Sequence, residues 1–251
     1  MIFDYKDIKN QLEELGLKKN DRFIVHTSLK SIGEMKKGAE TLFEAFLSII
    51  SDEGTVMAPG LSYMNVNKEN PVFDVLKTPV CVGAFPEFFR HQKSVIRSIH
   101  PTHSVLAYGK DSEKLTKNHI LDTTPAGENS PFRLLSKCKG KILMLGCGLC
   151  PNTSMHSVEE LCPPNYLYKN EKIEYTLIDY DRKEHKAFHI PHGFENVAAQ
   201  RYDRITDFLY GDEIKEGMIG NAKAYLIDSE SMFLKCSKVL KEHPLYFVDM
   251  K

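Results

Sequence analysis

Apolar residues spaced three or four positions apart predict a series of amphipathic helices along the chain. In residues 7–17, Ile8, Leu12 and Leu15 fall on one helix face, and Gly16 is suited to end the helix. The periodicity is strongest in GAETLFEAFLSII. That segment and the other predicted helices span residues 38–50, 84–91, 112–119, 130–138, 152–161, 194–210 and 229–242.

Short runs of β-branched and other apolar residues separate these helices and predict strands. The strands are expected at residues 21–29, 54–59, 103–109, 141–147 and 222–228. Around the polar turn DYDRK, apolar and polar positions alternate across residues 171–190, which predicts an antiparallel hairpin. Strands that alternate with helices indicate an α/β protein. We expect a mixed central sheet with helices on both faces, to which the hairpin is added late.

The chain contains no repeat, low-complexity stretch or linker, so we expect residues 1–251 to form a single domain. Two segments depart from its regular pattern. Residues 60–80 have no clear period and contain three asparagines and two prolines, which predicts a long loop that acts as a lid over a binding site. Residues 166–192 are expected to form an insertion that carries the hairpin.

Composition is typical of a soluble globular protein and excludes two classes of partner. Hydrophobic residues make up 42% of the chain and charged residues 27%. With 33 basic and 34 acidic residues the formal net charge is −1, so no overall field attracts nucleic acid or an anionic membrane. The same balance is not what a dedicated binder of large polycations would have.

The first residues carry charge every few positions and lack the apolar run of a signal peptide. No window approaches 18 uninterrupted apolar residues, so no membrane span is predicted. We therefore expect a cytoplasmic protein. In that compartment its six cysteines are expected to be free thiols rather than a disulfide framework.

Small polar residues follow the first predicted strand, in VHTSLKSIG at residues 25–33. Ligands of open α/β sheets bind at the carboxyl ends of strands, which is where Thr27 and Ser28 are expected. These side chains are therefore candidates for ligand binding. The same residue types also cap ordinary turns, so the pattern alone leaves both readings open.

Two histidines flank Pro101 and Thr102 in SIHPTHSVLAYG, at residues 98–109. His100 and His103 have a spacing that can hold a metal ion if a third ligand converges on them. An isolated pair in a loop is more often structural, so this pair does not by itself predict a metal site.

The stretch GCGLCPNTSMHSVEELC at residues 146–162 combines three cysteines, a histidine and two adjacent glutamates. A zinc site would use Cys147, Cys150, His156 and Cys162. It would contain a single CxxC knuckle, and the last two residues project about 240° apart on a continuous helix. A thioredoxin-like CxxC needs an early βαβ arrangement that the flanking pattern lacks. Zinc and redox chemistry remain the alternatives to a catalytic histidine.

His156 and Glu159 are three residues apart in the predicted helix and share one of its faces. A carboxylate beside an imidazole fixes its tautomer and stabilises its protonated form, as a general base requires. Thr153 lies one turn earlier, near the helix N-terminus, where N–H groups can hold an oxyanion. The residues alone do not exclude an ordinary surface ion pair.

The ordered motifs of the chain resemble those of the aminoglycoside 3-N-acetyltransferase family. The most specific are H-x-S-L at residues 26–29, H-P-x-H-S at 100–104 and N-T-x-x-H-x-x-E at 152–159. GAETLFEAF, GTVMAPG, TPAGENSPFRLL and KILMLGCG also occur in the family's order, and RYDRITDFLYGDEIKEGMIGNAKAYLID is similar to its C-terminal region. The resemblance covers nearly the whole chain.

This resemblance implies acetyl transfer from acetyl-CoA to a primary amine, on a fold distinct from that of the GNAT acetyltransferases. It assigns the general base to His156 and its partner to Glu159, and it places Thr153 close to the thioester. Direct transfer in a ternary complex implies no metal.

The resemblance also places CoA along Thr27, Ser28 and Leu29, with Ser104 nearby. The three cysteines of residues 146–162 lie outside the family pattern. We expect them to pack the strand against the helix as small apolar side chains.

The acceptor amine is left open between two classes. Aminoglycosides are polycations that suit a strongly acidic cleft, but residues 60–80 offer only Glu69 and Asp74. A nucleotide-linked amino sugar, as in a biosynthetic enzyme, is therefore an equal alternative. We expect a small-molecule acceptor, no nucleic-acid or membrane partner, and a monomer or homodimer.

Overall fold

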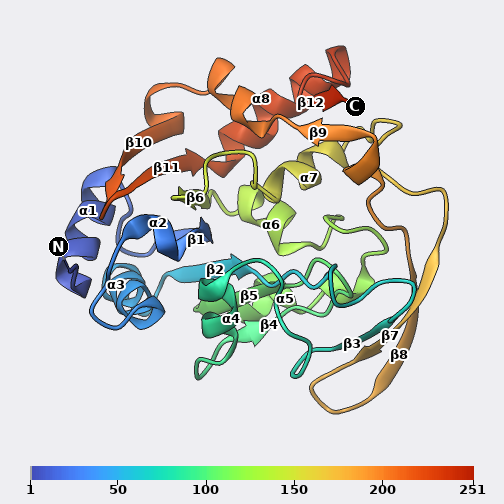
Figure 1. Ribbon diagram of the computed structural model, residues 1–251, viewed down its shortest axis with the longest axis horizontal. Helices are drawn as coiled ribbons and strands as arrows, with labels where there is room; N and C mark the ends of the chain where they lie inside the picture. Colours follow the sequence, from blue (N-terminus) through green and yellow to red (C-terminus); the bar gives the residue numbers. More distant parts are fainter. Residues whose placement is uncertain (1) are drawn as a thin grey trace.

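A seven-stranded mixed sheet lies at the centre of the protein (Figure 1). The computed structural model describes residues 2–251, apart from the side chain of Glu195. Across the sheet the strand order is β10–β11–β6–β1–β2–β5–β4. The bounds are β1 Arg22–Thr27, β2 Thr55–Pro59, β4 Ile96–Arg97, β5 Val105–Gly109, β6 Lys141–Leu145, β10 Ile214–Ile219 and β11 Ala222–Asp228. β6, β1 and β2 are parallel, whereas β11 and β5 pair antiparallel with β6 and β2, which confirms the predicted mixed sheet.

Polar residues lie together where the parallel strands of this sheet end, which we call the sheet edge. β1, β2 and β6 are parallel and therefore end at the same edge. β5 runs antiparallel to β2 with Val105 opposite Pro59, so β5 begins at that edge. The edge thus brings together His26 near the end of β1, His103 just before β5 and Cys147 just after β6.

Helices cover both faces of the sheet, as predicted, because alternate residues of each strand point to opposite sides. Phe23 and Val25 of β1 pack in one core with α1 (Tyr5–Leu15), α2 (Leu29–Ile32), α3 (Ala39–Ile50) and α4 (Ala84–Arg90). Ile24 packs in the other core with α5 (Ser112–Thr116), α6 (Pro131–Lys137), α7 (Ser154–Glu159) and α8 (Ser229–Glu242). Each fully buried side chain of this size contributes about 1.5–3 kcal/mol to folding, so the two cores fix the sheet edge in place.

The local end signals of the first helix are as expected. Asp4 accepts hydrogen bonds from the N–H groups of Lys6 and Asp7, and Asp7 accepts from the N–H of Asp4, which forms a capping box. Gly16 ends α1 with φ of 116°, a left-handed conformation that glycine adopts at no steric cost.

The predicted hairpin is present and forms the core of a second, three-stranded sheet. β7 (Ile173–Ile178) pairs antiparallel with β8 (Glu184–His189), and β7 pairs parallel with β3 (Val72–Asp74). β3 lies inside residues 60–80, so this segment is not a structureless loop. Asp74 accepts hydrogen bonds of 2.8 and 2.7 Å from the Arg182 guanidinium of the hairpin turn. The segment is thereby tied to the hairpin.

The prediction of a helix at residues 194–210 is wrong. The structure has two 3₁₀ turns, η2 (Phe194–Asn196) and η3 (Tyr202–Asp207), on either side of the strand β9 (Ala198–Gln200). β9 pairs antiparallel with β12 (Val248–Met250), and Gln200 lies opposite Val248. Pairing with a strand about 50 residues later overrides the local apolar spacing.

Two further 3₁₀ turns, η1 (His119–Leu121) and η4 (Gly211–Glu213), complete the elements. α7 is shorter than the predicted helix of residues 152–161, and Thr153 precedes it without a side-chain capping bond. In the described part of the chain, no helix is long and apolar enough to cross a membrane.

Candidate active site

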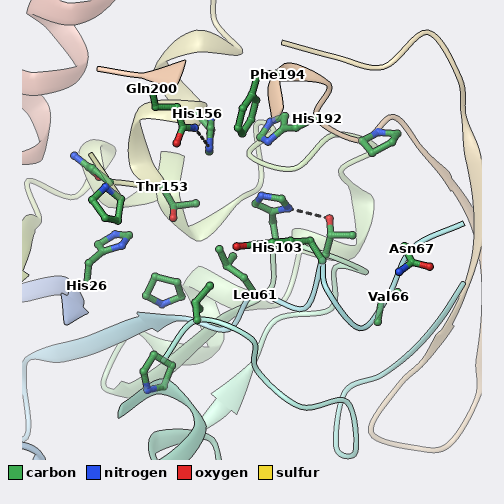
Figure 2. Close-up of a pocket in the computed structure, with 18 of the residues that line it drawn as sticks. His26, Leu61, Val66, Asn67, His103, Thr153, His156, His192, Phe194 and Gln200 are labelled. Atoms are coloured by element: carbon green, nitrogen blue, oxygen red, sulfur yellow. Dashed lines mark hydrogen bonds between the residues drawn. The ribbon is translucent and has the colours of Figure 1, made fainter. Parts of the chain in front are cut away.

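A cavity of about 820 Å³ opens at the sheet edge that collects the strand ends. Figure 2 shows Thr153, His156, His103 and His192 around its middle, with His26 on one side and Asn67 on the other. We call these two sides the His26 side and the Asn67 side. The lining comes from the ends of β1 and β2, from α7, from residues 60–80 and from the hairpin and β9 regions.

His156 and Glu159 form the hydrogen-bonded pair that their spacing predicts. His156 Nδ1 donates to Glu159 Oε2 over 2.8 Å, and both side chains are buried. The residues between β6 and α7 turn the chain so that the first turn of α7 faces the cavity. The pair is therefore an interior one and not the ordinary surface pair that the sequence left open.

Two tyrosines complete the hydrogen bonds of Glu159. The Tyr166 hydroxyl donates to Oε1 and the Tyr202 hydroxyl donates to Oε2, each over 2.7 Å. Burial and the neighbouring Glu159 raise the pKa of both phenols well above the usual range, so both remain protonated donors. A carboxylate with three donors is held in one orientation, and it holds the imidazole in turn.

The second ring nitrogen of His156 faces Gln200. Gln200 Nε2 donates to His156 Nε2 over 3.1 Å and also lies 3.2 Å from the Tyr202 hydroxyl. With Nδ1 carrying the hydrogen, Nε2 is the nitrogen whose lone pair is directed at the cavity wall formed by β9. Phe194 stacks on the imidazole with ring centroids 5.1 Å apart.

A second histidine and glutamate lie directly beside this pair. Glu160 accepts hydrogen bonds from the Thr124 hydroxyl (2.6 Å) and the Ala126 N–H (2.8 Å). His192 Nε2 is 3.6 Å from Glu160, too far for a hydrogen bond, and neither His192 nitrogen has a hydrogen-bond partner among the described side chains. Burial raises the pKa of Glu160 and lowers that of His192, which keeps His192 neutral.

The predicted metal candidates do not converge. His100 Nδ1 accepts from the His103 N–H over 2.9 Å, and its Nε2 is bonded to the Thr124 carbonyl over 3.1 Å, so this ring is structural. Among the side chains that the structure describes, no group of three or more His, Cys, Asp or Glu is placed to hold a metal ion.

The cysteines are free thiols, and two of them line the cavity on the His26 side. Burial raises the pKa of Cys147 to about 11 and also raises that of Cys150. A redox-active CxxC needs a lowered thiol pKa, so these thiols are poorly suited to that chemistry. Cys147 packs against the core under α7, as expected, and additionally forms part of the cavity wall.

Of the four residues predicted to bind CoA, only Thr27 lines the cavity. Its hydroxyl is buried and has no hydrogen-bond partner in the described chain. Ser28 is hydrogen-bonded to Ser31 over 2.9 Å, and Leu29 packs against the core of α1 and α3. Ser104 is fully buried, donates to the Gly60 carbonyl and accepts from Arg97 Nε.

Five residues around the histidine pair are absent from the sequence prediction. They are Tyr166, His192, Phe194, Gln200 and Tyr202. All five follow α7 in the chain and lie outside the three specific motifs. The only signal in the sequence is the similarity of residues 201–228 to the family's C-terminal region, which includes Tyr202 but assigns it no role.

Comparison with known proteins finds related sequences over most of the chain. The family model described as aminoglycoside 3-N-acetyltransferase matches residues 24–241. Aminoglycoside N(3)-acetyltransferase IX of Micromonospora chalcea is 27% identical over 90% of this chain and 89% of its own. An aminoglycoside N(3)-acetyltransferase III of Salmonella is 28% identical over 95% and 91%. A Bacillus subtilis prophage-derived homologue, YokD, is 30% identical over 63% and 65%.

Solved structures have the same fold. The YokD structure from Bacillus subtilis superposes with a TM-score of 0.84 at 25% identity, covering 98% of this chain and 96% of its own. The structure of AAC-IIIb in a binary complex with CoASH gives a TM-score of 0.82 at 26% identity, covering 96% and 97%.

Proposed function

The chain belongs to the aminoglycoside 3-N-acetyltransferase family and is an acetyltransferase, and from this premise we propose that it acetylates a primary amine with His156 as general base. The acetyl donor is acetyl-CoA, in keeping with the CoASH bound to the related AAC-IIIb. The observation that carries the proposal is the buried pair in which Glu159 holds Nδ1 of His156 while Nε2 faces the cavity.

This geometry suits attack by an amine on a thioester. The nitrogen lone pair forms a bond to the acetyl carbon, the π electrons of the carbonyl move to its oxygen, and His156 Nε2 accepts the amine proton. The oxyanion then re-forms the carbonyl, the carbon–sulfur bond breaks, and the leaving thiolate takes the proton from His156, which releases the thiol and restores the base. Glu159 stabilises the imidazolium between these steps. The acceptor amine displaces the Gln200 amide from Nε2.

We infer that CoA lies on the His26 side of the cavity. Thr27 ends β1 there and offers a buried hydroxyl without a protein partner. In this arrangement Ser28 and Leu29 shape the turn that follows β1, and Ser104 braces the wall behind it through Gly60. Thr153 lines the middle of the cavity, where the thioester meets the amine.

We infer that the acceptor lies on the Asn67 side, with residues 60–80 and the hairpin as its walls. Its charged lining consists of Lys68, Glu69, Lys169 and Glu171. Lys68 and Glu171 form a 2.7 Å ion pair, so the two signs are balanced. The family favours an aminoglycoside. The balanced lining favours the second candidate, a nucleotide-linked amino sugar, because a polycation would find little unpaired negative charge there.

Thiol release from acetyl-CoA, measured against a panel of aminoglycosides and nucleotide-linked amino sugars, tests the function. The best acceptor should require His156: we expect His156→Ala to lower kcat by about 10³-fold or more. Its Kd for CoA should change little. His91→Ala, at an exposed histidine directly after α4, is the matched control and should keep normal turnover. Near-normal turnover of His156→Ala would sink the mechanism, and an inactive native enzyme with every acceptor would sink the function.

A further inference from the structure

His103 also faces the middle of the cavity, and it has no part in the proton transfer described above. His103 stands just before β5, at the sheet edge beneath α7. Its ring centroid is 6.3 Å from that of His156 and the two rings are nearly perpendicular, at 83°. Only 7% of His103 is exposed, so what it can contact is what enters the cavity. Figure 2 shows this ring near the middle of the cavity, below Thr153 and His156 in that view.

The surroundings of His103 leave one ring nitrogen for a ligand. Nδ1 is 2.8 Å from the Thr102 hydroxyl, and the main-chain N–H is anchored on His100. The hydrogen bond of the ring to Thr102 engages Nδ1 and not Nε2, and His103 lines the cavity. Nε2 is therefore the ring nitrogen that can meet a ligand there. When the Thr102 hydroxyl donates to Nδ1, the ring hydrogen is on Nε2 and is directed at the cavity.

Electrostatics keep this ring neutral. Burial lowers the pKa of His103 well below its usual value, and His192 and His156 lower it further. A neutral imidazole N–H donates a hydrogen bond without adding a charge beside His156 when that residue is protonated. Neutral histidine acts in this way, as an electrophile, in other enzymes that polarise a carbonyl.

We propose that His103 Nε2–H donates the hydrogen bond that stabilises the oxyanion on the acetyl carbonyl, and that the Thr102 hydroxyl fixes the tautomer that allows it. The inference rests on the proposed acetyl transfer. As the amine nitrogen bonds to the acetyl carbon, the carbonyl π pair moves to oxygen and His156 takes the amine proton. His103 keeps its hydrogen throughout and shares it with the oxyanion until the carbon–sulfur bond breaks and the carbonyl re-forms.

Neighbouring donors are less suited to this role. Both nitrogens of His192 are buried and do not open onto the cavity. α7 has six residues, too short to supply a strong N-terminal field, so the predicted contribution of Thr153 reduces to its hydroxyl at the cavity wall. His103 is the neutral ring donor that faces the same space as the His156 base.

The test replaces the carbonyl oxygen of the donor by sulfur. Acetyl-CoA and its dithioacetyl analogue are compared in the native enzyme and in His103→Ala, with the best acceptor of the panel. Sulfur accepts hydrogen bonds weakly, so an oxyanion donor should matter mainly for acetyl-CoA. We expect His103→Ala to lower kcat for acetyl-CoA by about 10²–10³-fold, to change its KM little, and to lose most of the native preference for acetyl-CoA over the analogue.

Two conservative variants separate this role from a structural one. His103→Gln retains an N–H donor and should recover part of the rate and of the preference for oxygen. Thr102→Val removes the hydroxyl that sets the tautomer and should lower kcat, whereas Thr102→Ser should retain it. In the native enzyme, ¹⁵N correlation spectra of labelled histidine should show His103 neutral with its hydrogen on Nε2 at pH 7.

The outcomes are distinct. An active enzyme in which His103→Ala slows both donors equally, or in which His103 carries its hydrogen on Nδ1 or is protonated at pH 7, overturns the inference alone. A rise in the acceptor KM with an unchanged preference for oxygen also overturns it, because it assigns His103 to acceptor binding. An enzyme that transfers acetyl to no acceptor overturns the proposed function together with this inference.

Discussion

Glu159 and Glu160 are consecutive, both carboxylates are buried, and each faces a histidine, yet their surroundings differ completely. Glu159 is 2.8 Å from His156 and accepts from two tyrosines. Glu160 is 3.6 Å from His192 and holds the Thr124–Ala126 loop instead. The contacts of the first pair suit the proposed proton transfer, whereas Glu160 of the second pair holds a neighbouring loop in place.

The two pairs contain the same residue types, so the difference between them lies in their hydrogen bonds. Burial disfavours a charged imidazole and a charged carboxylate alike. For Glu160 the hydrogen bonds from Thr124 and Ala126 offset burial only in part, so its pKa rises, and burial lowers the pKa of His192. Around Glu159, three donors converge on one carboxylate, which is the arrangement needed to stabilise charge inside a protein.

The largest effect is expected when each of the two carboxylates is replaced in turn by an amide. Glu159→Gln should lower kcat by about 10²–10⁴-fold, because the amide cannot stabilise the imidazolium and favours the wrong tautomer. Glu160→Gln should change kcat by less than about fivefold, since the amide oxygen can still accept from Ala126 and burial already disfavours the charge. Steady-state thiol release measures both. Equal losses in the two variants would contradict the distinction between the pairs.

A strong acid sensitivity of stability is the second expectation. The pKa values of six buried histidines are lowered, to about 3 for His26 and His119, to about 4 for His189, and well below 6.5 for His100, His103 and His192. Below pH 6.5 the unfolded chain therefore binds protons that the folded chain does not. The free energy of unfolding should therefore fall as the pH is lowered from 6.5 toward 4.

Thermal unfolding at pH 7.5, 6.0 and 5.0 measures this sensitivity. His192→Leu is the informative variant, because the His192 nitrogens have no partner in the described chain. At pH 7.5 its stability should be close to that of the native protein, and its loss at pH 5.0 should be smaller. A native protein equally stable at pH 5.0 and 7.5 would show that these histidines are not held neutral by burial.

The smallest effects are expected from the tyrosines beside Glu159 and Glu160. Tyr166→Phe removes one of the donors to Glu159 and should lower kcat by about three- to tenfold, because His156 and Tyr202 still donate to the carboxylate. Tyr168 lies beside Glu160 and Thr124, so Tyr168→Phe is its counterpart and should leave kcat within about twofold. If Tyr168→Phe is the more damaging variant, Glu160 has a role in turnover that its contacts do not reveal.

The sequence predicts the central sheet and the histidine pair for a shared reason: both rest on local spacing. KILMLGC is a continuous apolar run that can only be a buried strand, and His156 and Glu159 share a face at three residues' separation. Ser130 caps α6 and Pro131 opens it, in agreement with the predicted helix. Such features depend on neighbours along the chain, so they survive without knowledge of the fold.

The remainder of the site depends on contacts between distant segments. Gln200 reaches His156 only because β9 pairs with β12, and the apolar spacing around Val197 and Ile205 imitates a helix instead. Tyr202 reaches Glu159 from 43 residues away, and Tyr166, although only seven residues from Glu159, lies beyond the end of α7 in a segment without period. A hydrogen bond between residues 40 apart leaves no periodic trace, so spacing could not identify these partners.

The position of β11 has a consequence for how the protein is made. β11 supplies the neighbour of β6, from Lys141 opposite Asp228 to Leu145 opposite Ala224, and it lies near the end of the chain. While a ribosome synthesises the protein, β6 therefore presents an unpaired edge until residues 222–228 have emerged, and β9 still lacks β12. Because β11 and β12 are made last, we expect a chain that is released before them to aggregate through its unpaired strands rather than to retain partial activity.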